Sequence, residues 1–234
     1  MVFVISDLHG YPHDRLLSLL DKAGFSDEDF LYVLGDVVDR NGDGGVATLQ
    51  WLLYQPNAQL ILGNHEAMLL GCSFVFDEID ESFEEKMTAE KLDMLQRYMA
   101  DGGDVTLKAM QKLNREEQQD ILDYLRECPL YEALSIKDRD FILAHSGLGN
   151  FAPKKRIEDY TVDDLIWTRP ELTDKYYRNI YTVLGHTPTL SYGDQYKDKI
   201  IRTETWIDID MGAGFGREPV LVRLDDMAEF RLDS

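Results

Sequence analysis

The sequence predicts an α/β fold in which polar residues collect at the ends of the strands. Three observations support this prediction. The chain opens with an apolar strand, helix and strand at residues 2–5, 16–23 and 30–34, a pattern typical of a βαβ unit with parallel strands. Each of these strands ends directly in a short run of glycine, aspartate or histidine. After residue 130 short apolar segments recur, which predicts a second group of strands.

The first half of the chain continues this alternation. Gly24 follows the first helix and suits its left-handed C-terminal position. We expect a second helix at 46–54, which Pro56 ends, and a third strand at 58–62. Because α/β sheets bind ligands at the carboxyl ends of their strands, the polar residues at these ends are candidate site residues.

A helical block follows. Residues 77–93 carry eight acidic residues against two lysines, which predicts a solvated, partly helical segment rather than a site. Helices are expected at 89–100, 104–113 and 115–127, the last with Asn114 as N-cap and Glu117 three positions later. We interpret residues 77–127 as a helical insertion or cap within a single domain of residues 1–234. Plain support for the sheet is the alternative.

The second half supplies the remaining strands. Segments 140–144 and 180–184 run into His145 and His186, and an aromatic and basic turn is expected at 166–170. Strands are also expected at 206–210 and 220–224, joined through a turn at 211–214.

Composition excludes several classes of protein. A formal net charge of −20 argues against binding the phosphate backbone of nucleic acids. Cys72 and Cys128 have no CxxC spacing, so neither a disulfide framework nor a cysteine zinc site is expected. No apolar run reaches the ~18 residues of a membrane span. Met1 leads directly into an apolar strand without a basic signal-like region, so we expect no membrane partner and a cytoplasmic protein.

The residues at the strand ends are suited to binding metal ions. Four of the five histidines follow apolar strands, and the set supplies nitrogen and oxygen ligands without thiolates: Asp7, His9, Asp36, Asn64, His145 and His186. Such ligands suit manganese, iron, zinc or nickel. Six side chains are too many for one catalytic ion that keeps an open position, so they predict two divalent ions that share a bridging carboxylate.

Five short motifs resemble those of the calcineurin-like metallophosphoesterases, and more narrowly the phosphoprotein phosphatases of the compact bacterial and bacteriophage type. The motifs occur in the family's order over nearly the whole chain: Asp-Leu-His-Gly at 7–10, Gly-Asp-Val-Val-Asp-Arg at 35–40, Gly-Asn-His-Glu at 63–66, His-Ser-Gly at 145–147 and Gly-His-Thr-Pro at 185–188. Trp167-Thr168-Arg169 is similar to that branch's second arginine motif.

The resemblance implies a role for each matching residue. Asp7 and His9 would hold the first ion, Asp36 would bridge, and the second ion would be held by Asn64, His145 and His186. Arg40 and Arg169 would bind the phosphoryl oxygens, and His65, oriented by Asp39, would be the general acid. The implied fold is a central β-sandwich of mixed sheets flanked by helices. The implied reaction is in-line attack on phosphorus by a hydroxide bridging the two ions, and manganese is the expected metal.

Three departures from the family pattern concern the surroundings of this set. Asn41 stands where the family usually has glycine, and asparagine tolerates a positive φ. Ser6 replaces a leading glycine. The eukaryotic tyrosine loop near the C-terminus is missing, which leaves the substrate groove undefined.

The sequence therefore predicts a metal-dependent phosphomonoesterase acting on phosphoserine or phosphothreonine in proteins. The same motifs also fit a symmetrical dinucleoside-tetraphosphate hydrolase. An alternative of another class is a metal-binding interaction module that has lost catalysis. Hydrolysis of an aryl phosphate with added manganese separates this last alternative from the two enzymes.

Overall fold

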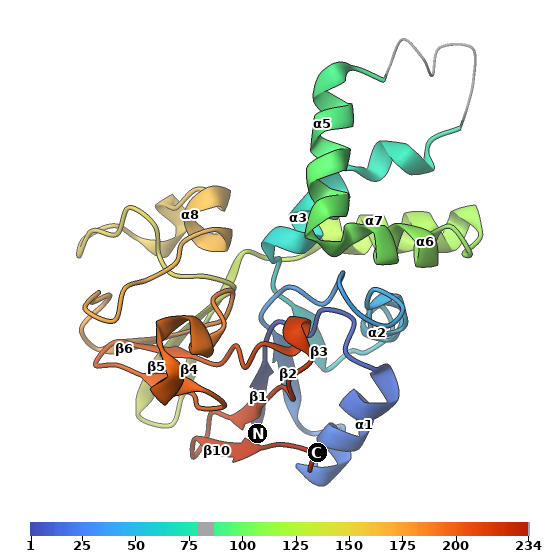
Figure 1. The fold of residues 1–234 in the computed structure, drawn as a ribbon. Coiled ribbons are helices and arrows are strands. Elements are labelled where there is room, and N and C mark those ends of the chain that lie inside the picture. The colour runs from blue at the N-terminus through green and yellow to red at the C-terminus, as the bar shows by residue number, and fades with distance from the viewer. Residues whose placement is uncertain (79–86, 234) are drawn as a thin grey trace.

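Two five-stranded sheets lie at the centre of the protein and are flanked by helices (Figure 1). The structure, a computed structural model, describes residues 1–78 and 87–233. The strands of the first sheet are β1 (Val2–Ile5), β2 (Phe30–Val33), β3 (Ala58–Leu60), β9 (Leu221–Arg223) and β10 (Ala228–Phe230). Those of the second are β4 (Tyr131–Ile136), β5 (Arg139–Ala144), β6 (Ile180–Leu184), β7 (Ile201–Arg202) and β8 (Trp206–Asp208).

The first sheet joins the two ends of the chain. Its order is β10-β9-β1-β2-β3. Strands β1, β2 and β3 are parallel, as the βαβ pattern predicted, whereas β9 and β10 are antiparallel additions from the C-terminal end. The second sheet, in the order β4-β5-β6-β8-β7, also mixes parallel and antiparallel pairs. The mixed sheets implied by the resemblance are therefore confirmed.

Alternation along β1 shows how the layers pack. Phe3 and Ile5 face the helices, whereas Val4 points to the other side, into the core that both sheets share. That shared core combines Tyr32 of the first sheet with Phe141 and Val183 of the second. The arrangement is a β-sandwich with a helical layer on the first sheet.

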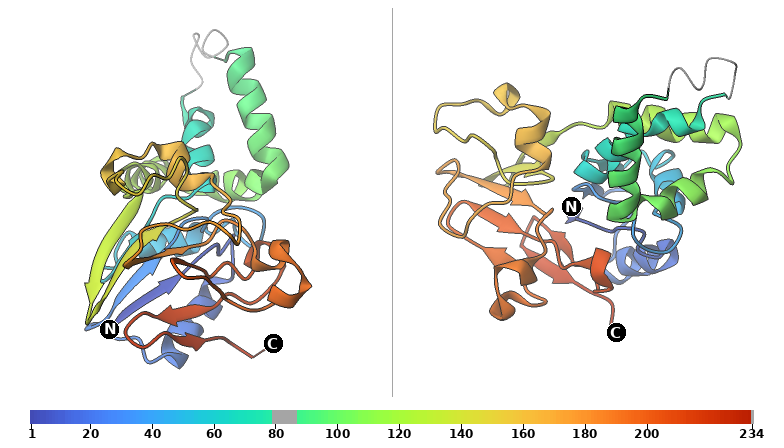
Figure 2. Two further views of the ribbon diagram at one scale, coloured as in Figure 1. Left: turned by 90° about the vertical axis from the view of Figure 1, so that its left-hand side faces the viewer. Right: turned by 45° about the horizontal axis from the view of Figure 1, so that its top comes forward.

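The longer helices are α1 (His13–Lys22), α2 (Val46–Leu52), α3 (Asn64–Gly71), α5 (Ala89–Tyr98), α6 (Asp104–Met110), α7 (Arg115–Glu127) and α8 (Val162–Ile166). Short helical turns are η1 (Ser73–Phe76), η2 (Met99–Gly103), η3 (Ile157–Asp159), η4 (Thr189–Tyr192), η5 (Asp194–Tyr196) and η6 (Ala213–Phe215). Figure 2 shows α5 projecting away from the sheets, above α6 and α7. Among the described residues, no helix is both long and apolar enough to cross a bilayer.

Most predicted boundaries hold to within a few residues. Gly24 has a φ of +71°, and Asn114 caps α7 together with Glu117, both as predicted. Part of the acidic segment at 77–93 lies outside the described residues, because residues 79–86 are not described. The division into one domain with an insertion at 77–127 stays a prediction.

Five predicted elements need correction. The helices expected at 46–54 and 104–113 end at Leu52 and Met110. The turn expected at 166–170 begins one residue too early, because Ile166 is the last residue of helix α8. This helix was missed because its five residues are too few for a periodic pattern. Strands β8 and β9 are shorter than expected and lie in different sheets, so the segment between them crosses from one sheet to the other.

Candidate functional site

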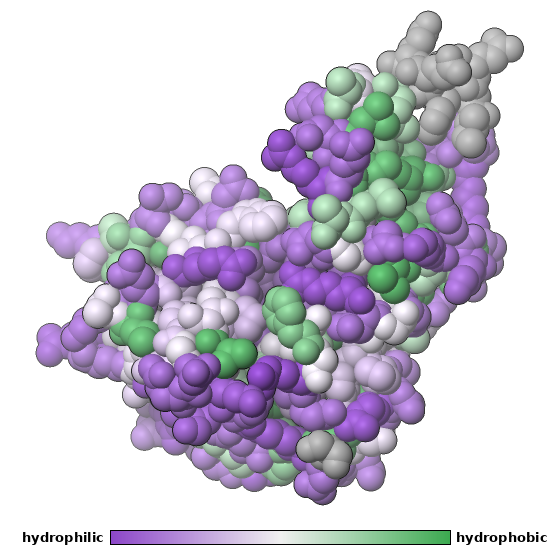
Figure 3. Space-filling model, viewed as in Figure 1, coloured by the Kyte–Doolittle hydropathy of each residue, from purple (hydrophilic) through white to green (hydrophobic). Residues whose placement is uncertain are grey.

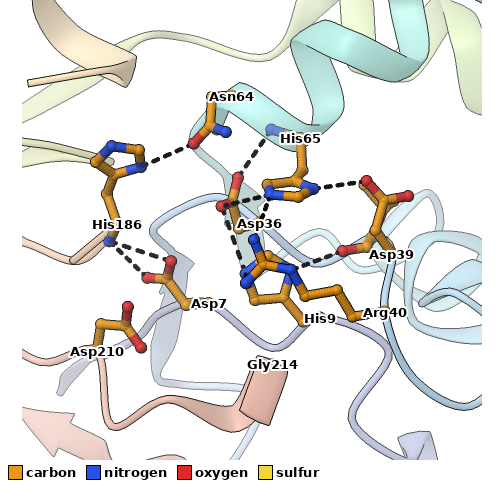
Figure 4. Close-up of polar contacts among 12 residues, drawn as sticks. Asp7, His9, Asp36, Asp39, Arg40, Asn64, His65, His186, Asp210 and Gly214 are labelled. Carbon is orange, nitrogen blue, oxygen red and sulfur yellow. Dashed lines mark hydrogen bonds and ion pairs between the residues drawn. The ribbon is translucent and has the colours of Figure 1, made fainter. Parts of the chain in front are cut away.

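The polar ends of the central strands meet at one edge of the sandwich (Figure 4). Asp7 and His9 follow β1, Asp36 follows β2, Asn64 begins α3 after β3, and the last two residues follow β5 and β6: His145 and His186. All six side chains are buried. The structure thus brings together every residue that was predicted to bind metal. The absence of a side chain at Gly35 makes this possible, since a Cβ there would lie 2.5 Å from Nδ1 of His145 and 2.7 Å from Cα of Gly63.

Backbone strain concentrates at these residues. Among the described residues, ten non-glycine residues have a positive φ. Six of the ten are predicted site residues: Asp7, His9, Asp36, Asp39, Arg40 and His186. Such conformations are unfavourable for side chains with a Cβ and persist where the surrounding structure enforces them. Their clustering marks this edge as the functional part of the molecule.

Asp36 lies between two clusters of potential ligands. The ligand atoms of His9, Asp36 and His65 lie within 4.8 Å of one another, and so do those of Asp36, His145 and His186. Asp36 Oδ2 is 3.6 Å from His9 Nε2, and Oδ1 is 3.4 Å from His145 Nε2. One carboxylate therefore presents an oxygen to each cluster. Asp7 belongs to neither triad, and both its oxygens accept from the backbone N–H of His186.

The second cluster has the donor chemistry of a cation site. Nδ1 of His145 is 2.7 Å from the carbonyl of Leu34, which we interpret as an N–H donating to that oxygen and leaving Nε2 as an acceptor. That Nε2 faces Oδ1 of Asn64 at 2.9 Å and Nδ1 of His186 at 3.2 Å. Nε2 of His145 and Oδ1 of Asn64 are then both acceptors, with no hydrogen between them. A cation bound to both atoms removes their repulsion. In addition, Nε2 of His186 is buried and has no hydrogen-bond partner among the described residues.

Burial also affects the charges of these groups. Burial raises the pKa of the Asp36 carboxyl well above its usual range, and nearby Glu66 adds to the shift. Burial likewise raises the pKa of Asp7, with a contribution from Asp210. Burial lowers the pKa of His145, and it lowers the pKa of His186 to about 3, so both rings are neutral as metal ligands require. Bound cations balance the negative charge of such a group of buried carboxylates.

His65 and Asp39 form a fully buried pair. Nδ1 of His65 lies 2.6 Å from Oδ2 of Asp39. The other oxygen of Asp39 accepts hydrogen bonds from the hydroxyls of Tyr98, at 2.7 Å, and Thr106, at 2.6 Å. These contacts fix the carboxylate, which in turn orients the imidazole so that Nε2 faces the cavity that His65 lines. Tyr98 and Thr106 belong to the helical block, so this block supports the site directly.

The two predicted arginines line the same cavity. Arg40 places Nη1 3.2 Å from Nε2 of His9 and Nη2 3.0 Å from Nε2 of His65. Arg169 approaches the carbonyl oxygen of His186 at 3.5 Å. Phe215, on η6, also lines the cavity, and its ring centroid lies 5.2 Å from the guanidinium carbon of Arg40. The segment after β8 therefore supplies an aromatic wall where the sequence left the groove undefined.

Several residues of the site were missed from the sequence. The Glu66 carboxylate accepts from the backbone N–H groups of Asp36, Val37, Val38 and Gly63 at 2.8 to 3.2 Å, and so fixes the loop after β2. Its place in the Gly-Asn-His-Glu motif was a usable signal. Asp208 and Asp210 are also buried, and Asp210 lines the cavity. Their alternate positions in the strand expected at 206–210 were a usable signal, because a buried carboxylate needs a compensating partner.

Asn41 needs a correction. It was expected to occupy a glycine-like position with positive φ, but the positive φ angles belong to Asp39 and Arg40. Asn41 instead uses its side chain, donating from Nδ2 to the carbonyl oxygens of His9 at 3.0 Å and Ala213 at 3.3 Å. Ser6, the other departure, is buried and donates to Asp7.

Comparison with known proteins agrees with this geometry. The family model described as Calcineurin-like phosphoesterase matches residues 1–210. The chain is 26% identical over 215 residues to "Serine/threonine-protein phosphatase 2" of Salmonella typhimurium, covering 91% of this chain and 87% of that protein. It is 29% identical over 148 residues to "Bis(5'-nucleosyl)-tetraphosphatase, symmetrical" of Salmonella paratyphi C, covering 62% of this chain and 43% of that protein.

A solved structure titled "Crystal structure of a putative diadenosine tetraphosphatase" superposes with a TM-score of 0.64 at 19% identity, covering 99% of this chain and 92% of that one. This likeness concerns the fold. The two mixed sheets and the paired clusters of histidine and aspartate define a metallophosphoesterase, a class of hydrolase that uses a dinuclear metal centre. The chain belongs to the calcineurin-like phosphoesterase family.

Proposed function

We propose that this protein is a metal-dependent phosphomonoesterase that hydrolyses phosphoserine and phosphothreonine in proteins. The observation that carries the chemistry is the position of Asp36, with one oxygen toward each cluster. Similarity to a serine/threonine-protein phosphatase over 91% of the chain supports the substrate class.

In this proposal the six buried side chains hold two divalent cations. Asp7 and His9 hold the first, Asp36 bridges, and the second is held by Asn64, His145 and His186. When bound, the cations supply a nucleophile at neutral pH and neutralise charge on the phosphoryl oxygens. Manganese is the proposed metal.

Arg40 and Arg169 bind the phosphoryl group, a planar task that suits the guanidinium fork. Arg40 contacts Nε2 of both His9 and His65. Binding an ion at His9 and phosphate at Arg40 therefore requires Arg40 to release these nitrogens.

His65 acts as general acid and donates the proton on Nε2 to the departing alkoxide oxygen. Its Nδ1 stays bonded to Asp39, which is held by two hydroxyls and stabilises the doubly protonated ring. The pair thus transfers a proton without moving the imidazole.

A substrate panel tests the proposal. Manganese-loaded protein is expected to hydrolyse a phosphoserine or phosphothreonine peptide with a higher kcat/KM than a dinucleoside tetraphosphate. Activity is expected to disappear with a chelator and to return with manganese. The partial match to a symmetrical tetraphosphatase supports a second candidate, dinucleoside-tetraphosphate hydrolysis. A far higher kcat/KM for the tetraphosphate would favour that candidate.

A further inference from the structure

A carboxylate from the helical block reaches the predicted catalytic groups. Asp101, on η2 between α5 and α6, lines the cavity with a side chain that is 49% exposed. Its Oδ1 lies 3.1 Å from Nη2 of Arg40, and its Oδ2 lies 3.7 Å from Nε2 of His65. No sequence motif used above included this residue.

The backbone holds Asp101 in this place. The carbonyl of the next residue, Gly102, accepts the backbone N–H of Arg40 at 3.1 Å. Gly102 has a φ of +100°, and a Cβ there would lie 2.8 Å from Cγ of Arg40. On either side of Asp101 in the sequence, Tyr98 and Thr106 bond to Asp39. Residues 98–106 are therefore hydrogen-bonded to the Asp39–Arg40 turn, and these bonds fix the position of Asp101.

We propose that Asp101 is a specificity-determining residue that disfavours substrates carrying a second phosphoryl group next to the scissile one. The inference rests on the proposed function, because it takes Arg40 as a phosphate-binding residue and His65 as the proton donor.

The position of the leaving group carries the argument. A leaving oxygen that takes a proton from Nε2 of His65 has to lie within hydrogen-bond distance of it. The atom beyond that oxygen then comes within several ångströms of the Asp101 carboxylate. In a phosphoserine or phosphothreonine residue this atom is an uncharged carbon. In a dinucleoside polyphosphate it is a phosphorus with negatively charged oxygens. Two like charges about 5 Å apart repel each other. At an effective dielectric constant between those of water and a protein surface, this repulsion weakens binding by roughly tenfold.

Asp101 also competes for Arg40. Its carboxylate accepts a hydrogen bond from Nη2 of Arg40, one of the donors proposed to bind phosphate. Replacing the carboxylate by a neutral amide removes a competing anion. Binding of inorganic phosphate is therefore expected to become tighter by severalfold, independently of which ester is the substrate.

The test compares Asp101→Asn with a matched control in the manganese-loaded full chain. The control is Asp104→Asn, three residues away, whose carboxylate pairs with Lys108 at 2.6 Å and is not among the cavity-lining residues. In Asp101→Asn, the rise in kcat/KM is expected to be roughly tenfold larger for a dinucleoside tetraphosphate than for a phosphopeptide with uncharged flanking residues, whose rate gains only from the donor freed on Arg40. Asp104→Asn is expected to change neither. Calorimetric titration with inorganic phosphate gives the binding constant for each variant.

The proposal is overturned if Asp101→Asn and Asp104→Asn shift the two substrates alike, because distant charge then accounts for the effect. It is also overturned if Asp101→Asn and a second variant, Asp101→Ser, leave the substrate ratio and phosphate affinity unchanged. A wild-type protein inactive on every phosphopeptide would contradict the proposed function instead. In that case a rise in tetraphosphate hydrolysis and phosphate affinity in Asp101→Asn still supports the role of Asp101.

Discussion

At the scale of single residues, the site depends on where individual donor atoms point. Asp36 presents one oxygen to each cluster, and it also accepts the backbone N–H of His65 at 3.0 Å. Its own backbone N–H is held by Glu66 at 2.8 Å. The carboxylate is thus fixed from both ends before any ion binds, which lowers the cost of assembling a dinuclear site.

Asp36→Asn is expected to abolish activity more completely than loss of any one terminal ligand. The neutral amide cannot supply the negative charge that holds two dications close together. Metal content, measured on the purified variant, is expected to fall to one ion or fewer per chain. Retention of two ions with near-normal turnover would contradict the bridging assignment.

His65→Asn is expected to leave the metal content unchanged and to lower kcat by roughly 10²- to 10⁴-fold, the usual contribution of a general acid. The loss is expected to be smaller for a nitrophenyl ester, because that leaving group departs without a proton. Steady-state kinetics on an alkyl and an aryl phosphate measure the difference. Equal losses on both substrates would assign His65 a different role.

At the scale of elements, the helical block contributes hydrogen bonds to the candidate site. Tyr98 ends α5 and Thr106 lies in α6, and both donate to Asp39, while η2 between them contacts Arg40. Both side chains are buried. Any displacement of α5 or α6 is therefore transmitted to the His65–Asp39 pair through two short hydrogen bonds.

Tyr98→Phe is expected to destabilise the protein by about 1.5–3 kcal/mol, since it removes a hydrogen bond to a buried charged group. The turnover number is expected to fall as well, because Asp39 loses one of the two hydroxyls that fix it. Urea unfolding and kinetics on the metal-loaded protein measure both effects. The matched control is Tyr54→Phe at a tyrosine that is 77% exposed. Equal effects of the two substitutions would exclude a role for the Tyr98 hydroxyl.

At the scale of the whole molecule, the negative net charge opposes the approach of the anionic phosphate that the site is proposed to bind. The chain has 44 acidic and 24 basic residues, a net charge of −20, and Figure 3 shows hydrophilic residues over much of the face drawn. This far field repels anions and attracts cations over a Debye length of ~8 Å at physiological salt. Bound divalent ions reverse the local field inside the cavity.

Raising the salt concentration is expected to lower kcat/KM for a phosphopeptide flanked by lysine or arginine, because screening removes the long-range attraction. For a dinucleoside tetraphosphate, kcat/KM is expected to rise or stay level. Kinetics at several ionic strengths check this, with a phosphopeptide of uncharged flanks as control. The same salt response for all three substrates would show that the surface charge plays no part in selection.

The sequence by itself determined the parallel βαβ start, most of the strands and the set of candidate ligands. It could do so because apolar runs that end in glycine, aspartate and histidine are local patterns, readable within a few residues. The same is true of the cap at Asn114.

Only the tertiary structure decided how these pieces support one another. β9 pairs with β1 across more than 200 residues, and Asp101, Tyr98 and Thr106 reach the Asp39–Arg40 turn from a helical block that carries no ligand motif. Glu66 likewise bonds to backbone N–H groups about 30 residues away. Such contacts depend on packing between distant segments, and a hydrogen-bond partner brought in by packing leaves no periodicity or spacing in the sequence.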